Sequence, residues 1–239
     1  MTTLSILFVG LLLGMQHATE ADHLAAVASL ATQQTSLART LRLGVAWGVG
    51  HALTLMLFAG VVLVLGRVIS PDLERTLETA VGVMLVGLGG DVLRRLLRDR
   101  IHFHVHHHAP ATRHVHAHSH RGEGPHAGSA HSHEHAERLP MRALAVGTMH
   151  GLAGSAALVV LSLRAVPSVT LGLSYIALFG VGSMIGMALL SVAIAVPLRA
   201  TAARLTRLHR WLTASVGVFS CSLGLWVIWG SGLSQVWLA

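Results

Sequence analysis

The sequence predicts an all-α, polytopic membrane protein whose six transmembrane helices form two inverted three-helix repeats. Its 239 residues are 53% hydrophobic and only 11% charged, and the mean hydropathy is +0.64. A soluble core of this size would carry about twice that charged fraction. The net charge of +7 comes entirely from Arg, which falls between the apolar stretches. Membrane topology therefore explains this charge better than nucleic-acid binding does.

Six apolar stretches are long enough to cross a bilayer, which takes about 20 residues each. We expect these spans near residues 4–31, 43–66, 77–97, 141–163, 170–197 and 211–236. They divide the chain into a first transmembrane repeat (1–97), a connecting loop (98–140) and a second transmembrane repeat (141–239).

The arginines fall mostly on one side of this topology. Fourteen lie in or beside loops one, three and five, and three lie on the other side. Positive charge marks the cytoplasmic face, so these loops are predicted to be cytoplasmic and both termini outside, in the inner (plasma) membrane. The apolar N-terminal run has no positive segment before it, so we interpret it as a retained span and not as a cleaved signal peptide.

The two halves of the chain resemble each other at nearly one offset. The matching segments are 14–18 with 147–151, 47–51 with 179–183, and 80–83 with 215–218. Because each half has three spans, the second half has to insert upside down relative to the first. Inverted repeats are typical of transporters, which bind their substrate between the halves near the middle of the membrane. This relation would bring His17 and His150 face to face.

A strongly polar stretch interrupts the first span. It contains His17, Glu20, Asp22 and His23, and one acid near the membrane centre costs roughly 2.5 to 3.5 kcal/mol. On a straight helix His17, Glu20 and His23 would share one face, whereas Asp22 would point nearly opposite. A site that uses Asp22 with both histidines therefore requires a local break, as in known transporter sites. The alternative is a polar seam between helices that binds nothing.

Two further histidines lie within predicted spans. His51 follows a Gly-Val-Gly segment in the second span, and a lone histidine of this kind is otherwise a hydrogen-bonded interface residue. His150 begins the segment His-Gly-Leu-Ala-Gly-Ser, whose glycines Gly151 and Gly154 would permit a break. The candidate metal ligands are therefore His17, Glu20, Asp22, His23, His51 and His150.

The third loop is rich in histidine. Thirteen of the eighteen histidines lie between His102 and His135, among prolines and glycines and with little apolar content. We expect this loop to be disordered. Neutral imidazole suits nickel, cobalt, copper and zinc, so the loop is expected to collect or buffer a transition metal on the cytoplasmic face. A solvated linker and a pH sensor are the alternatives.

Two motifs resemble the nickel/cobalt transporter superfamily. They are His17-x4-Asp22-His23 in the first span and Gly50-His51-Ala-x-Thr54 in the second. The closer likeness is to the short, six-span branch, which includes transmembrane proteins associated with urease. The resemblance implies that His17, Asp22 and His23 recognise Ni²⁺ or Co²⁺ with the assistance of His51. The cation would be the transported substrate, with no prosthetic group, and nickel-enzyme maturation proteins are possible partners.

Other readings stay open at this point. Zinc exporters also combine six spans with a His-rich loop, and an accessory protein could deliver metal to an enzyme without transporting it. An intramembrane hydrolase would need three ligands and an open position, but the chain has no His-Glu-x-x-His segment. A thiol-based electron carrier needs two cysteines, and the chain has only Cys221. We therefore expect a carrier and not an enzyme, with the direction of transport undetermined.

Overall fold

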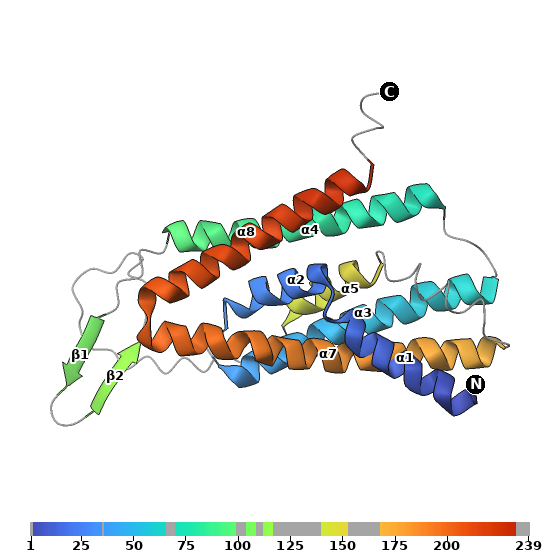
Figure 1. Cartoon of the computed structure of the whole chain (residues 1–239), viewed down its shortest axis with the longest axis horizontal. Coiled ribbons are helices and arrows are strands. Elements are labelled where there is room, and N and C mark those ends of the chain that lie inside the picture. The colour runs from blue at the N-terminus through green and yellow to red at the C-terminus, as the bar shows by residue number, and fades with distance from the viewer. Residues whose placement is uncertain are drawn as a thin grey trace.

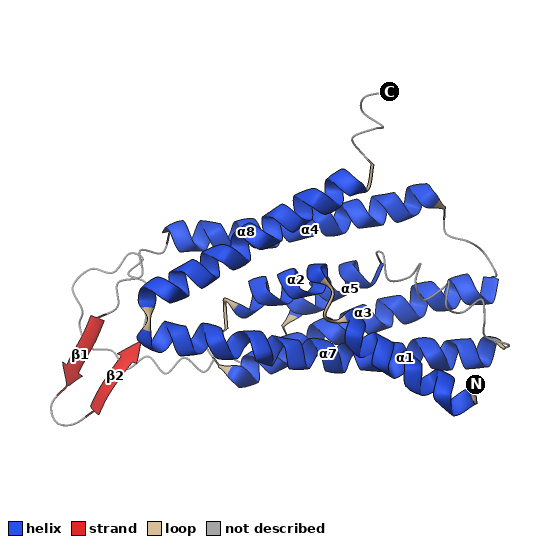
Figure 2. Ribbon diagram, viewed as in Figure 1, coloured by secondary structure: helices blue, strands red, loops and turns tan. Residues whose placement is uncertain are grey.

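The protein is a bundle of long helices that carries a small hairpin at one end (Figures 1 and 2). The computed structural model describes residues 2–34, 36–65, 70–98, 104–108, 112–116, 140–152 and 168–232. The described helices are α1 (Thr3–His17), α2 (Ala21–Ala31), α3 (Leu37–Leu65), α4 (Pro71–Arg98), α5 (Met141–Leu152), α7 (Val169–Arg204) and α8 (Thr206–Gly230). The described strands are β1 (His104–His108) and β2 (Thr112–His116).

Four described helices are long and apolar enough to cross a membrane, namely α3, α4, α7 and α8. A fifth candidate span is the pair α1 and α2, which is bent by 57°. The outer surface of these helices is apolar, as Leu57 (70% exposed) and Trp226 (71% exposed) illustrate. The chain is therefore a multi-pass membrane protein. Of the fourth predicted span (141–163), the structure describes only α5 and no residue beyond 152, so the six-span prediction stays a prediction.

The first span is broken, as a joint site for Asp22 and its two neighbouring histidines requires. Helix α1 ends at His17, and two turn hydrogen bonds follow, from the N–H of Thr19 to Gln16 O and from the N–H of Glu20 to His17 O. Glu20 is extended (φ −63°, ψ 151°), and α2 begins at the next residue. The chain thus changes direction between the two histidines, and a straight helix through this stretch is excluded.

Helices α2 and α5 are short and lie between two groups of longer helices (Figure 1). On one side of them α4 packs along α8, and on the other side α3 packs against both α7 and α5 while α1 packs against α7. Helix α2 touches α7, α8 and α4. Its contact with α8 includes a buried hydroxyl pair, Ser29 Oγ to Ser220 Oγ at 2.9 Å, and Ser220 also donates to the carbonyl of Ala25. These bonds fix α2 against the C-terminal helix.

Glycines let α1 approach α7, and α5 approach α3, backbone to backbone. A Cβ added at Gly14 in α1 would overlap the carbonyl oxygen of Phe179 in α7. A Cβ added at Gly147 in α5 would likewise overlap the carbonyl oxygen of Trp47 in α3. Close approach at small residues is the usual way in which membrane helices pack. Gly14 and Gly147 therefore mark two close helix contacts, α1 with α7 and α5 with α3.

The pair α4 and α8 has the same kind of contact at two points. A Cβ at Gly89 would lie 2.6 Å from the carbonyl oxygen of Gly217, and one at Gly224 would lie 2.5 Å from that of Gly82. Each helix thus contributes two glycines to one close interface.

The described part of the connecting loop is a two-stranded hairpin. Strands β1 and β2 pair antiparallel, with His104 opposite His116 and His106 opposite His114. The loop was expected to be disordered, and this pairing shows that the expectation was wrong for the two strands. The expected disorder of the rest of 98–140 falls outside the described residues and stays a prediction, as does the division into three parts.

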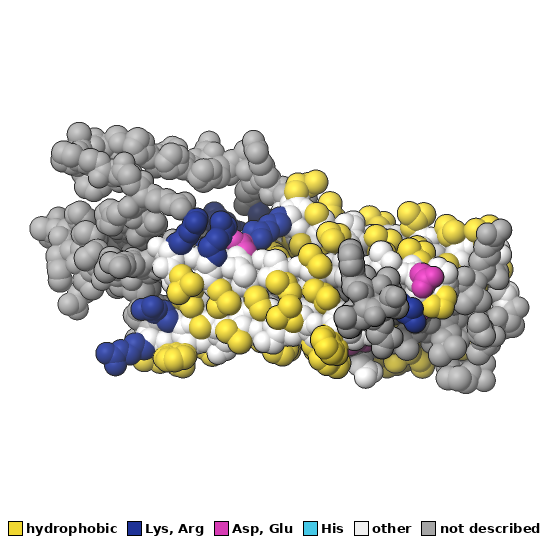
Figure 3. Space-filling model, turned by 90° about the horizontal axis from the view of Figure 1, so that it is seen from above, with side chains coloured by type: hydrophobic (Ala, Val, Ile, Leu, Met, Phe, Trp, Pro, Cys, Tyr) yellow, Lys and Arg dark blue, Asp and Glu magenta, His cyan; other side chains and the backbone are white. Residues whose placement is uncertain are grey.

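Charge is distributed unevenly along the molecule. Near the hairpin end, the carboxylate of Asp91 is bound by Arg94 (3.0 Å), by Arg95 and by Arg142 (2.9 Å), which joins the end of α4 to the start of α5. Figure 3 shows basic side chains gathered at this end, while hydrophobic side chains cover much of the remaining described surface. Figure 1 shows that α1 begins and α8 ends at the opposite end.

Candidate metal centre

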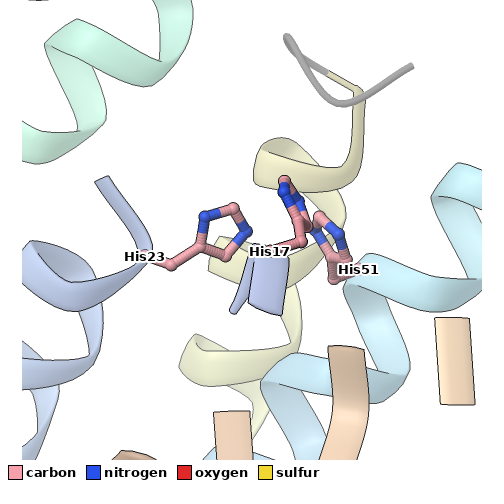
Figure 4. A group of neighbouring side chains, drawn as sticks. All are labelled: His17, His23 and His51. Atoms are coloured by element: carbon pink, nitrogen blue, oxygen red, sulfur yellow. The ribbon is translucent and has the colours of Figure 1, made fainter. Parts of the chain in front are cut away.

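Four buried imidazoles from four different helices meet beside the break in the first span. His17 ends α1, His23 lies in the first turn of α2, His51 lies midway along α3, and His150 lies near the end of α5. Their exposed fractions are 5%, 1%, 0% and 2%. Figure 4 shows the rings of His17, His23 and His51 directed toward one another.

His23 is at the centre of this cluster. Its ring centroid lies 4.4 Å from that of His17, 4.1 Å from that of His150 and 5.2 Å from that of His51. The indole of Trp47 also stacks on His23, with centroids 5.7 Å apart and planes inclined by 21°. One turn of α3 separates Trp47 from His51, so this helix supplies both a stacking surface and a donor.

In both His17 and His23, one ring nitrogen is hydrogen-bonded to a carboxylate. Glu20 Oε1 lies 2.8 Å from His17 Nδ1, and Asp22 Oδ1 lies 3.0 Å from His23 Nδ1. A carboxylate accepts and does not donate, so each Nδ1 carries the proton and each Nε2 keeps its lone pair. Carboxylate–histidine pairs of this kind fix the ring and raise its basicity toward a metal.

The free nitrogens of the cluster have no hydrogen-bond partner in the part of the chain that the structure describes. Within the described chain, His17 Nε2, His23 Nε2 and both ring nitrogens of His51 are buried without a hydrogen-bond partner. Leaving a buried polar atom unsatisfied costs about 1–3 kcal/mol. One ligand atom from each of these three residues lies within 4.8 Å of the other two. The arrangement therefore fits a cation better than it fits a polar seam between helices.

A second set of possible ligands overlaps the first. Asp22, His23 and His150 also bring one ligand atom each within 4.8 Å of one another. Here Asp22 Oδ2 accepts a hydrogen bond from His150 Nε2 at 2.8 Å, so a single carboxylate contacts two imidazoles. Asp22 is 31% exposed, whereas both histidines are buried.

All six residues singled out in the sequence lie in or beside this cluster, and their role as ligands stays a prediction. Two details of the expected geometry differ from what is observed. Asp22, expected as a direct ligand beside His17 and His23, is bonded to His23 and His150. In the described ring contacts His17 and His150 do not meet face to face, because His23 lies between them.

The sequence analysis did not assign a role to Trp47. Its indole is fully buried, stacks on His23 and has a ring N–H without a partner in the described structure. The spacing of one helical turn before His51 was the only available signal. Ser183 in α7, the counterpart of His51 in the predicted repeat, is also fully buried with an unpartnered hydroxyl among the described residues.

The chemistry of the donors narrows the range of cations. Imidazole nitrogen suits nickel, cobalt, zinc and copper, whereas magnesium and calcium prefer sites made of oxygen. Three neutral imidazoles with carboxylates behind them would therefore select a divalent transition metal.

The chain is 32% identical over 232 residues to the urease accessory protein UreH of Bacillus sp. (strain TB-90). The match covers 97% of this chain and 94% of the relative. No protein-family model matches the chain, and no solved structure does.

Proposed function

Because the chain belongs to the family of the urease accessory protein UreH, we propose that it carries Ni²⁺ or Co²⁺ across the membrane through the imidazole cluster. The observation that carries this proposal is the set of buried, unpartnered nitrogens of His17, His23 and His51. Urease is a nickel enzyme, so a membrane protein that supplies its metal would be an accessory to its maturation.

The polarity of the cluster supports a cation as its occupant. Three imidazoles and two carboxylates beside a break in a membrane span would be costly if nothing bound there. A divalent cation that enters this site exchanges its hydration shell for imidazole nitrogens. Glu20 and Asp22 would balance its charge through His17 and His23, to which they are hydrogen-bonded.

We also propose that the two halves are an inverted repeat of three spans each. The offset of 132–133 residues seen in the sequence relates the close contact of Gly14 with Phe179 to that of Gly147 with Trp47. Such paired contacts are what a pseudo-twofold axis between two halves would produce. The metal site would lie at the meeting of the halves, as in other transporters with inverted repeats.

The remaining pair of helices supports the same relation. An offset of 135 residues relates Gly82 to Gly217 and Gly89 to Gly224. The exchange of α4 and α8 therefore converts the contact of Gly89 with Gly217 into the contact of Gly224 with Gly82.

The His-rich loop would serve the carrier as a metal reservoir. We place it in the cytoplasm, together with the basic end of the bundle, because positively charged residues mark the cytoplasmic side. There it could load the site for export, or receive metal that has been imported and pass it to nickel-enzyme maturation proteins.

Uptake of metal into proteoliposomes tests this function. Proteoliposomes that contain the purified protein should accumulate Ni²⁺ or Co²⁺. The same assay with Zn²⁺ tests the alternative of a zinc carrier. His17→Ala should lower metal affinity more than tenfold, which is over about 1.4 kcal/mol. His209→Ala is the matched control, because His209 lies in α8 and bonds the carbonyl of Leu198 outside the cluster. Metal binding without uptake would instead favour an accessory role in metal delivery.

A further inference from the structure

We propose that the cluster holds a single cation in two alternative positions that share His23. The first position consists of His17, His23 and His51, and the second consists of Asp22, His23 and His150. This inference rests on the proposed function, and it adds the path by which a cation passes through the site.

The chemistry of His23 makes the two positions mutually exclusive. A neutral imidazole has one lone pair, because its other nitrogen carries a proton. His23 can therefore bind one cation at a time, whichever of its nitrogens is used. Its ring is also the nearest neighbour of both flanking imidazoles, at 4.4 Å from His17 and 4.1 Å from His150.

The described conformation has the first position ready and the second closed. Nδ1–H of His23 donates to Asp22, which leaves His23 Nε2 without a hydrogen-bond partner among the described residues, and one ligand atom of His23 lies within 4.8 Å of one from His17 and one from His51. In the second position Asp22 already accepts hydrogen bonds from His23 and His150. For a cation to enter there, the bond between Asp22 and His150 has to open.

Moving between the positions is a balanced exchange of ligands. The cation gives up the nitrogens of His17 and His51, and it gains the carboxylate of Asp22 and Nε2 of His150. The proton of His150 moves from Nε2 to Nδ1, which has no hydrogen-bond partner among the described residues, while His23 keeps its proton on Nδ1. His23 remains bound, so the cation is never bare in a low-dielectric environment. The first position draws on α1, α2 and α3, whereas the second draws on α2 and α5.

The helix contacts indicate what could drive this exchange. Helix α1, which carries His17, packs against α7, and α5, which carries His150, packs against α3, which itself packs against α7. Helix α2, which carries His23, packs against α4, α7 and α8. A shift of α2 between α1 and α5 would bring His23 closer to one flanking imidazole and move it away from the other. The cation would then follow the closer imidazole.

The test counts metal equivalents in the full-length protein by equilibrium dialysis with Co²⁺. The His-rich loop also binds metal, so the equivalents of the cluster are the difference between wild type and His23→Ala, which removes both positions. We expect a difference of one. A difference of two would overturn the proposal, because it would mean that both positions fill at once.

Two single variants separate the positions. His51→Ala should keep the one cluster equivalent through the second position, with binding at least tenfold weaker than in wild type. His150→Ala should keep it through the first position, with an affinity close to that of wild type. The double variant should lose it. Complete loss in either single variant would overturn the proposal, since it would indicate one undivided site.

Transport supplies the second readout. Uptake into proteoliposomes should fall more than tenfold in both single variants although each still binds, because the path is interrupted. Near wild-type uptake in either variant would refute the proposed exchange between the two positions.

Gln replaces Ala at any position where the Ala variant fails to elute as a folded protein, and His209→Ala should behave as wild type throughout. Absence of uptake in the wild type would refute the proposed function alone, because the dialysis still tests the two positions.

Discussion

The carboxylate of Asp22 accepts a hydrogen bond from His150 at 2.8 Å, which joins residues 128 positions apart in the chain. The same carboxylate accepts from His23, so it connects a motif in the first half to a histidine in the second half. Asp22 is thus placed to orient both rings. The predictions for this residue and for its neighbours follow from that arrangement.

Replacing Asp22 by Asn should separate metal binding from transport. The amide keeps the size of the side chain but removes its charge and one of its two acceptor oxygens. Loss of such a partner typically costs 10–100-fold in metal affinity, so we expect weaker binding by about that factor. Transport should be abolished while the protein still folds. Isothermal titration with Ni²⁺, paired with uptake, measures both effects, and wild-type uptake would contradict the assigned role.

Glu20→Gln should be the milder change. The Glu20 side chain is 47% exposed, and among the described residues its carboxylate bonds only His17. The carboxylate of Asp22 bonds two imidazoles. We expect a smaller loss of affinity than in Asp22→Asn, measured by the same titration under the same conditions. If Glu20→Gln lost as much metal affinity as Asp22→Asn or more, this expectation would be wrong, and metal binding would depend on the carboxylate of Glu20 at least as much as on that of Asp22.

Two glycines should be equally sensitive to a methyl group. Gly14→Ala and Gly147→Ala would each drive a Cβ into a backbone carbonyl, which costs roughly 1–3 kcal/mol of unfolding free energy. Gly87→Ala is the control, because a Cβ there meets nothing within 4 Å. It should be neutral or stabilising, since Ala favours a helix by about 1 kcal/mol over Gly. Thermal unfolding in detergent compares the three, and unequal effects at Gly14 and Gly147 would argue against the repeat.

Accessibility labelling should resolve the topology. In a Cys221→Ala background, Thr3→Cys and Ser119→Cys each carry the single thiol of the chain. Six spans put these positions on opposite sides, with Ser119 cytoplasmic and Thr3 outside. A membrane-impermeant maleimide applied to intact cells should label only Thr3→Cys. Labelling of both from outside would refute the topology.

Deleting residues 102–135 should spare the carrier itself. The deletion removes the His-rich part of the loop and leaves all four imidazoles of the cluster in place. We expect uptake at saturating metal to stay near wild type and uptake at low metal to fall. If a well-folded deletion variant lost saturated uptake as well, the loop would belong to the transport path.

Much of the site was predictable from spacing alone. His17, Asp22 and His23 cannot share a face of a straight helix, so their joint use predicted the break that ends α1 at His17. The partner of Asp22 was not predictable, because it depends on how closely α5 approaches α3. That approach is set by Gly147 against the backbone of Trp47, a contact between segments about 100 residues apart.

The role of Trp47 was missed for a related reason. An apolar residue in an apolar helix gives no signal in the sequence, and its stacking on His23 becomes apparent only when α2 is placed beside α3.

The long apolar spans, by contrast, were predictable from hydropathy, since α3, α4, α7 and α8 each overlap an expected stretch. The hairpin of the His-rich loop was not, because its composition favours no packed core.

The break between α1 and α2 also has an electrostatic consequence. A helix carries about half a negative charge at its C-terminus and half a positive charge at its N-terminus. His17 occupies the last turn of α1, and Asp22 occupies the first turn of α2. An imidazole that bears a cation is thus at the end that favours positive charge, and the carboxylate is at the end that favours negative charge, each by about 0.3–1 kcal/mol. Dividing one span into two helices therefore makes the C-terminus of α1 a partial counter-ion for a cation held by His17.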